Sequence, residues 1–251
     1  MRTRTFCIRR SAIGALVTLV ACGGDNTPSS VAPPGAETTA VSRVLDAGAA
    51  ALQDKPPLEA LNAYLDGFHF YSGNLQGQME AHHYCGILND EVIQCVIYDG
   101  NTRDAKLMGV EYIVSEALFV DLPAEEQHLW HSHVHEVRSG ALIAPGIPNV
   151  AERELMQKIA GTYGKTWHTW HTDRGAELPT GHPMLMMGFT QDGQLREELI
   201  SARDERFGIS TEEERRERAD LSYPEIDPEA DAWQKGIALQ VQLSHVEGSV
   251  P

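Results

Sequence analysis

The chain is short of positive charge: its 251 residues include 20 lysines and arginines against 36 aspartates and glutamates, a formal net charge of −16. A protein that binds nucleic acid without sequence preference needs a basic surface, so we expect no nucleic-acid partner. The same deficit leaves little electrostatic attraction to anionic lipid headgroups. Membrane attachment would therefore need a covalent or apolar anchor.

The sequence also lacks several common functional motifs. Its four cysteines are too few for a disulfide scaffold. It contains no glycine-rich phosphate loop, no serine-centred nucleophile elbow and no internal repeat. Histidine, in contrast, is abundant: the chain has eleven, and ten of them fall between His69 and His182. The composition indicates an acidic, histidine-rich protein with a single globular domain.

The N-terminus resembles the export signal of a bacterial lipoprotein. Four arginines and no acid precede the apolar run 11–21, which has the length of a signal-peptide core and is shorter than the roughly 20 residues of a membrane span. The run ends in Leu-Val-Ala-Cys, a lipobox-like sequence in which Cys22 would carry a diacylglycerol. The alternative is an ordinary signal peptide followed by a chance cysteine. The Arg9-Arg10 pair leaves the twin-arginine and general export routes both open.

This leader predicts how the chain is organised. We expect a signal peptide over 1–21, a lipid-anchored flexible tether over 22–37, a folded domain over 38–199 and an acidic extension over 200–251. The expected location is the bacterial cell envelope, with the membrane as a partner through the lipid anchor. The outer membrane is favoured because Gly23, not an aspartate, follows the cysteine.

Hydrophobic periodicity predicts several strands and a few helices. Helices are expected over 38–53 and 149–163. Strands are expected over 67–71, 79–88, 92–98, 107–114, 131–137, 165–172 and 183–190. Because the two kinds of element do not alternate regularly, the predicted fold class is α+β, a mixed or antiparallel sheet with a few flanking helices.

A series of ordered motifs resembles one known family. The motifs are 68–71 (FHFY), 80–85 (EAHHYC), 94–99 (QCVIYD), 109–113 (GVEYI), 130–133 (WHSH), 145–148 (PGIP), 163–165 (YGK) and 185–187 (LMM). Over residues 61–199 they resemble the oil body-associated proteins of plant seeds, which have bacterial and fungal relatives. The resemblance implies association with lipid droplets and no assigned catalytic residues. The leader, His135 and His171 depart from the plant pattern, so we interpret the chain as a bacterial lipoprotein relative.

The histidines suggest a metal site. His131, His133 and His135 are two residues apart, so on a strand they would project from one face and offer nitrogen ligands to a divalent metal such as zinc or iron. A further ligand is expected from another element, and carboxylates behind the rings. The candidates are His82, His83 and His168 for the further ligand, and Glu111 and Glu136 for the carboxylates. The alternative is a set of hydrogen-bonded core and surface histidines.

A predicted hairpin places the two remaining cysteines together. If its loop is the three residues 89–91, Cys85 lies directly opposite Cys95. His83 then shares their face, whereas His82 lies on the other face. A two-residue loop would shift this pairing by one position. A Cys85–Cys95 disulfide and a pair of reduced thiols remain the two alternatives.

Two functions follow from these features. The favoured one is a non-enzymatic, lipid-anchored envelope protein that binds or supports a lipid or protein surface. The alternative is a histidine-rich metal-binding protein or metalloenzyme, on the outer face of the inner membrane or in the outer membrane. A hydrolase built on a pair such as His133 and Glu111 is a third possibility, for which no nucleophile can be named.

Overall fold

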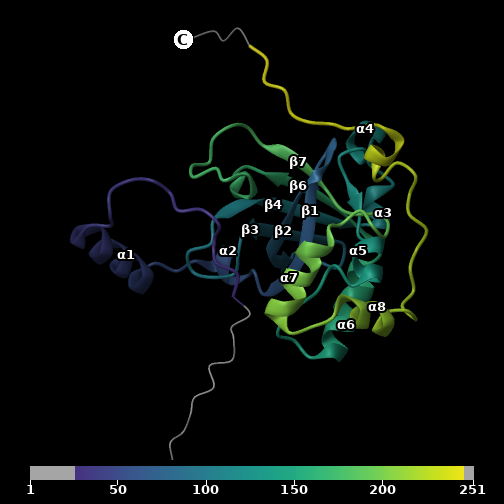
Figure 1. Cartoon of the computed structure of the whole chain (residues 1–251), viewed down its shortest axis with the longest axis horizontal. Helices are drawn as coiled ribbons and strands as arrows, with labels where there is room; N and C mark the ends of the chain where they lie inside the picture. Colours follow the sequence, from purple (N-terminus) through teal and green to yellow (C-terminus); the bar gives the residue numbers. More distant parts are fainter. Residues whose placement is uncertain (1–25, 246–251) are drawn as a thin grey trace, which may run out of the picture.

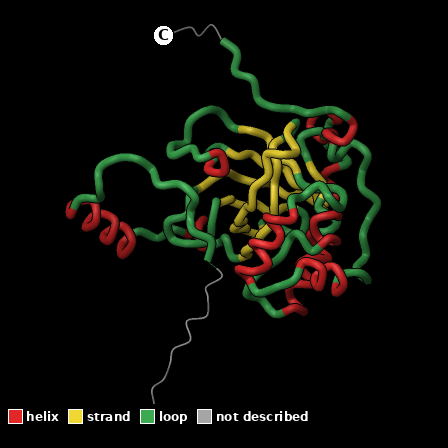
Figure 2. The backbone as a smooth tube through the Cα atoms, viewed as in Figure 1, coloured by secondary structure: helices red, strands yellow, loops and turns green. Residues whose placement is uncertain are grey.

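The computed structural model describes residues 26–245 (Figure 1). Within them, the strands are β1 (Ala63–Tyr71), β2 (Asn74–Ile87), β3 (Val92–Tyr98), β4 (Leu107–Ser115), β5 (His131–Ser132), β6 (Thr162–His168) and β7 (Met184–Met187). The α-helices are α1 (Ala40–Leu52), α2 (Pro56–Glu59), α3 (Glu116–Phe119), α4 (Ala124–Gln127), α5 (Val134–Ser139), α6 (Asn149–Ile159), α7 (Glu197–Phe207) and α8 (Thr211–Glu217). Short 3₁₀ turns cover Thr172–Arg174 and Ala232–Lys235. Figure 2 shows the strands gathered in the centre of the molecule.

The strands close into a barrel. Each strand pairs with the next in the order β4-β3-β2-β1-β7-β6, and β6 pairs again with β4, so six antiparallel strands of the described chain form a ring. The two residues of β5 pair with β6 beside β7. The α+β fold class expected from the sequence is therefore wrong. The protein is a closed, sheet-rich barrel with a few helices.

Two glycines allow the ring to close between β4 and β6. A Cβ atom at Gly109 would lie 2.1 Å from the carbonyl oxygen of Trp167, and one at Gly164 would lie 2.1 Å from Oε1 of Glu111. Only glycine permits the approach of backbone to backbone at Gly109, whereas Gly164 leaves room for the side chains of Glu111 and His131. Hydrophobic periodicity identifies strands but not which edges pair, and for this reason the sequence did not predict closure.

Most predicted elements lie near their expected positions, with one clear exception. The expected helices correspond to α1 and α6. The expected strand over 131–137 is wrong, because the extended segment ends at Ser132 and α5 starts at Val134. Gly140, with a φ of 80°, ends this helix. The spacing of these histidines, one at every second residue, matches the period of a strand, but the segment from Val134 onward is helical.

The β2–β3 hairpin has the predicted register. The amide of Leu88 donates to the carbonyl of Val92 at 2.9 Å, and Cys85 pairs with Cys95, so the three-residue loop is confirmed. In the structure the two sulfurs are joined in a disulfide within the core. His82 and His83, adjacent on β2, therefore reach two different environments.

Two buried arginines attach the C-terminal helices to the segment that follows α5. Arg203 of α7 donates to the carbonyls of Ala141 at 2.9 Å and Gly140 at 3.2 Å. Arg218, just after α8, donates to the carbonyl of Leu142 at 2.7 Å. A buried guanidinium is tolerated only where its donors find acceptors, and here the acceptors are backbone carbonyls. As a result α5, α6, α7 and α8 lie together on one side of the barrel (Figure 1).

The α1 helix lies apart from the barrel (Figure 1), and none of its residues is buried. The described residues before it, 26–37, contain no helix or strand. In the part of the chain that the structure describes, no helix has the length and hydropathy needed to cross a membrane. The predicted signal peptide and Cys22 lie outside the described residues.

Candidate metal centre

The interior of the barrel holds a buried carboxylate surrounded by histidines. On β4, Glu111 and Ile113 point inward and line a cavity, whereas Tyr112 between them is exposed. Four histidines surround the carboxylate. His69 lies on β1, His83 on β2 and His131 on β5, and His133 directly precedes α5. Glu111 and these four residues are each at most 4% exposed.

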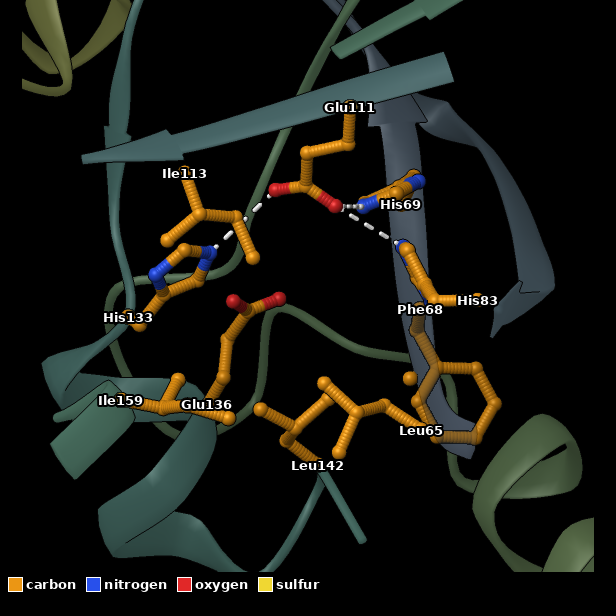
Figure 3. Close-up of a pocket in the computed structure, with 11 residues that line it drawn as sticks. Leu65, Phe68, His69, His83, Glu111, Ile113, His133, Glu136, Leu142 and Ile159 are labelled. Carbon is orange, nitrogen blue, oxygen red and sulfur yellow. Dashed lines mark hydrogen bonds and ion pairs between the residues drawn. The ribbon is translucent and has the colours of Figure 1, made fainter. Parts of the chain in front are cut away.

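Each carboxylate oxygen of Glu111 faces its own pair of histidines. Oε2 lies 3.0 Å from Nε2 of His83 and 4.0 Å from Nε2 of His69. Oε1 lies 3.3 Å from Nε2 of His133 and 3.4 Å from Nε2 of His131. Figure 3 shows His133 to one side of the carboxylate and His69 and His83 to the other. All four imidazoles thus direct the same ring nitrogen at one carboxylate.

Two of these rings are held in place by a contact to their second nitrogen. Nδ1 of His133 lies 2.8 Å from the hydroxyl of Thr162. Nδ1 of His69 lies 3.4 Å from Nε2 of His168, which is also buried. Histidines that bind metals usually have such a partner for the ring nitrogen that faces away from the ion. The two contacts leave Nε2 of His69 and of His133 directed at Glu111.

Among the four histidines around Glu111, three other ring nitrogens have no hydrogen-bond partner in the described part of the chain. They are Nδ1 of His83 and both ring nitrogens of His131. Nε2 of His131 is 3.4 Å from Oε1 of Glu111 but does not have hydrogen-bond geometry. Leaving a buried polar atom without a partner costs about 1–3 kcal/mol. A cation beside Nε2 of His131 would supply the partner that the protein does not.

Burial and the charge of Glu111 set the protonation of this cluster. Burial lowers the pKa of His69 and His133, and lowers that of His168 to about 3, so these three rings are neutral at pH 7. Burial opposes a charge on His131 as well, but Glu111 outweighs it and raises the pKa of His131. Burial alone would raise the pKa of Glu111, yet the surrounding histidines hold it well below its usual range. An ionised Glu111 beside the neutral rings of His69 and His133 is a protonation state that binds metals.

The spacing suits ligand atoms that share a cation. Two ligand atoms bound at about 2.1 Å from one ion lie about 3.0 Å apart at a right angle and about 3.4 Å apart at the tetrahedral angle. Three of the four distances around Glu111 fall between 3.0 and 3.4 Å, and the 4.0 Å to His69 corresponds to a wider angle. Imidazole nitrogen and carboxylate oxygen together are ligands of zinc and of iron.

A small cavity lies beside Glu111, and Glu136 of α5 points into it (Figure 3). Its volume is about 10 Å³, room for about one water molecule. Its apolar walls are formed by Leu65, Phe68, Ile113, Leu142 and Ile159. Burial raises the pKa of Glu136 to about 8, so this carboxyl is largely protonated at pH 7. The cluster therefore faces a solvent-sized space with a carboxylic acid beside it.

A second buried cluster lies on the opposite face of β2. Nδ1 of His82 is 3.0 Å from Oδ2 of Asp66, and its Nε2 is 3.7 Å from Oε1 of Glu80. Arg203 lies 3.5 Å from Oδ1 of Asp66, and Arg206 pairs with Glu80. Two guanidinium groups thus face these carboxylates and offset their negative charge, although Arg203 also pairs with Asp204 at 2.9 Å.

Three of the predicted ligands, His83, His131 and His133, meet at Glu111. Glu111 was expected behind the ligands, as a hydrogen-bond partner of their outer nitrogens. It lies instead between the ring nitrogens. Glu136, the other expected carboxylate, lines the same cavity.

The other predicted ligands are elsewhere. His82 belongs to the second cluster. His168 contacts a neighbouring histidine and not the carboxylate. His135 was expected beside His131 and His133 on one strand, but α5 carries it away, and its Nε2 lies 3.9 Å from Oδ1 of Asp192.

His69 is the site residue that sequence reasoning missed. It lies between Phe68 and Phe70, which mark a buried strand, and strand register pairs it with Met79. Its only sequence signal is a buried position in the strand predicted over 67–71. That signal does not show which other residues it meets, because Glu111 lies three strands away around the barrel.

Comparisons with known proteins agree with the resemblance found in the motifs. The family described as Protein of unknown function (DUF1264) matches residues 55–222. Oil body-associated protein 1B of Arabidopsis thaliana is 46% identical over 219 residues, which is 86% of this chain and 91% of the relative. Oil body-associated protein 1A of Zea mays is 44% identical over 211 residues, 83% of this chain and 89% of the relative. Oil body-associated protein 2A of Zea mays is 43% identical over 240 residues, 90% and 95% of the two chains. No solved structure matches the chain.

These relatives overturn one expectation and confirm another. They are plant proteins named for oil bodies, so the predicted location as an exported bacterial outer-membrane lipoprotein is wrong. Lipidation of Cys22 concerns a residue outside 26–245 and stays a prediction. The family itself is confirmed by the matched region and by the identities: the chain belongs to the DUF1264 family and is a homologue of the oil body-associated proteins.

Proposed function

We propose that this protein binds a divalent transition metal, zinc or iron, inside its barrel through Glu111 and the histidines around it. One observation carries the proposal: four buried Nε2 atoms converge on one buried carboxylate. In the described part of the chain this carboxylate has no lysine or arginine partner. Several imidazole nitrogens around one buried negative charge form a site for a cation.

Metal content tests this proposal directly. The purified protein is stripped with a chelator, incubated with Zn²⁺ and assayed for bound metal by elemental analysis. We expect wild type to bind zinc, and Glu111→Gln to bind it at least about tenfold more weakly, because the carboxamide lacks the negative charge. Glu80→Gln is the matched control, since it makes the same change in the second cluster and should bind like wild type. No zinc in wild type, or equal binding by both variants, would contradict the proposal.

A second candidate function is attachment to a lipid surface. The relatives are named for oil bodies, and α1 presents an uncovered apolar stripe. The stripe is formed by Val41, Val44, Leu45 and Leu52, which are 68%, 72%, 68% and 86% exposed. A helix with one uncovered apolar face is suited to the boundary between water and lipid. Since the chain carries a net charge of −16, its attachment would depend on apolar contact and not on charge.

Flotation with triacylglycerol droplets coated in phosphatidylcholine tests this function. The double variant Val41→Ser with Leu45→Ser is expected to bind at least about tenfold more weakly, because two apolar side chains are lost from the contact. The control, Ala47→Ser with Ala50→Ser, changes exposed residues on the other side of the helix and should float like wild type. Equal flotation of both variants would exclude α1 as the attachment site.

A further inference from the structure

The two oxygens of Glu111 do not share their histidines. His69 and His83 face Oε2, whereas His131 and His133 face Oε1. The ligand atoms accordingly form two sets of three. Within each set the ligand atoms lie within 4.8 Å of one another, and Glu111 belongs to both sets. A carboxylate that binds a single ion through one oxygen does not need a second pair of imidazoles at its other oxygen.

We infer that the centre holds two metal ions bridged by Glu111, an inference that rests on the proposed metal binding. One ion is bound by Oε2, His69 and His83, and the other by Oε1, His131 and His133. The ring centroids lie 5.0 Å apart for His69 and His83 and 5.1 Å apart for His131 and His133, but 5.8 Å apart for His69 and His131, and this grouping suits two ions. Ions in two-metal sites are held about 3.5–4 Å apart.

This arrangement leaves open positions on both ions. Each ion receives two nitrogens and one oxygen from the protein, one ligand fewer than a closed tetrahedral site has. The cavity beside Glu111 is the space that these positions face, and its volume of about 10 Å³ admits a solvent-sized ligand. The centre is therefore suited to water, hydroxide or another small oxygen species between the ions. A lipid or other large organic molecule does not fit there.

Glu136 places a second carboxyl group at the same cavity. Its carboxyl group points toward Glu111 from the other side of the cavity (Figure 3). It comes from α5, whose C-terminal end is fixed by the hydrogen bonds of Arg203 and Arg218. A second carboxyl group thus lines the cavity without belonging to either set of three.

Variants that remove one histidine ligand from either ion test whether Glu111 bridges two ions. The metal-free full-length protein is titrated with Cu²⁺, and the ions bound per folded chain are counted by native mass spectrometry. We expect two ions in wild type, and one ion each in His83→Ala and in His133→Ala. Magnetic coupling between the ions, seen as a half-field signal by electron paramagnetic resonance, should be present in wild type and absent from both variants. His128→Ala changes a partly exposed histidine that pairs with Glu229, and should retain two coupled ions.

The outcomes separate this inference from the proposed function. One uncoupled ion in wild type would overturn the two-metal centre and leave the metal-binding function standing. No bound ion would overturn both. Circular dichroism shows whether each variant is folded, and His83→Gln and His133→Gln repeat the measurement if an alanine variant does not fold.

Discussion

His82 and His83 are neighbours in the chain, yet they belong to two clusters of opposite character. His83 faces Glu111 in a cluster of one carboxylate and four imidazoles. His82 lies between Asp66 and Glu80, which pair with Arg203 and Arg206 of α7.

The difference shows how similar residues acquire different roles. A guanidinium group keeps its charge at any ordinary pH, so it neutralises a buried carboxylate permanently. A neutral imidazole does not neutralise a carboxylate, but it offers a lone pair to a metal. We therefore interpret the Asp66 cluster as structural and the Glu111 cluster as a metal centre.

The largest effect is expected from removing an arginine from the structural cluster. Arg203→Met leaves Asp66 and the carbonyls of Gly140 and Ala141 without their buried partner. Breaking a buried ion pair on one side costs about 3–5 kcal/mol. Urea unfolding followed by circular dichroism should show this loss.

The matched control for that experiment is Arg215→Met. Arg215 forms its ion pair with Asp192 at the surface, where both side chains are exposed. Such pairs contribute about 1 kcal/mol or less. If the two variants lost equal stability, the structural role of the Asp66 cluster would be refuted.

A smaller effect is expected from the disulfide, which supports the Glu111 cluster. Cys95 lies directly opposite Glu111 in the β3–β4 pairing and is linked to Cys85 on its other side. Replacing both cysteines by serine should lower the free energy of unfolding by about 2–3 kcal/mol, the loop-closure value for so short a segment. The prediction requires that both cysteines resist alkylation in the unfolded, unreduced protein. Peptide mapping that finds both alkylated would establish the reduced alternative.

The smallest effect is a pH dependence from Glu80. Burial, followed by the charge of Asp66, raises the pKa of this carboxyl from 4.5 to about 7. Because the folded pKa lies above the unfolded value, the stabilisation is complete below about pH 4.5 and is lost as the pH rises through about 7. The full shift corresponds to roughly 3 kcal/mol, and we expect about half, because Glu80 is partly exposed and paired with Arg206. Unfolding free energies at about pH 5 and about pH 8 should differ less in Glu80→Gln than in wild type. The same pH dependence in both proteins would refute its assignment to Glu80.

Sequence reasoning succeeded where short-range register decides the outcome. The loop length of one hairpin was enough to place Cys85 opposite Cys95 and to separate His82 from His83. It failed where distant segments meet. The β4–β6 pairing that closes the barrel brings backbone close to backbone at Gly109, which strand periodicity does not reveal.

The acidic C-terminal segment shows the same limit. Its composition is typical of a solvated surface, and it gave no sign that Arg203 and Arg218 are fully buried. Both residues fix the segment after α5, and Arg203 also pairs with Asp66 of the second cluster. The contrast between the two clusters therefore depends on contacts that span more than 60 residues of sequence, and these were visible only in the folded chain.

The most direct test of the account is the position of the metal in a crystal of the protein grown with Zn²⁺. Anomalous diffraction at the zinc edge should show density within about 2.1 Å of the Glu111 carboxylate and of the histidine Nε2 atoms around it. The space between Asp66, Glu80 and His82 should hold none. Zinc bound at the Asp66 cluster, or a Glu111 cluster that stays empty at saturating zinc, would contradict the central claim.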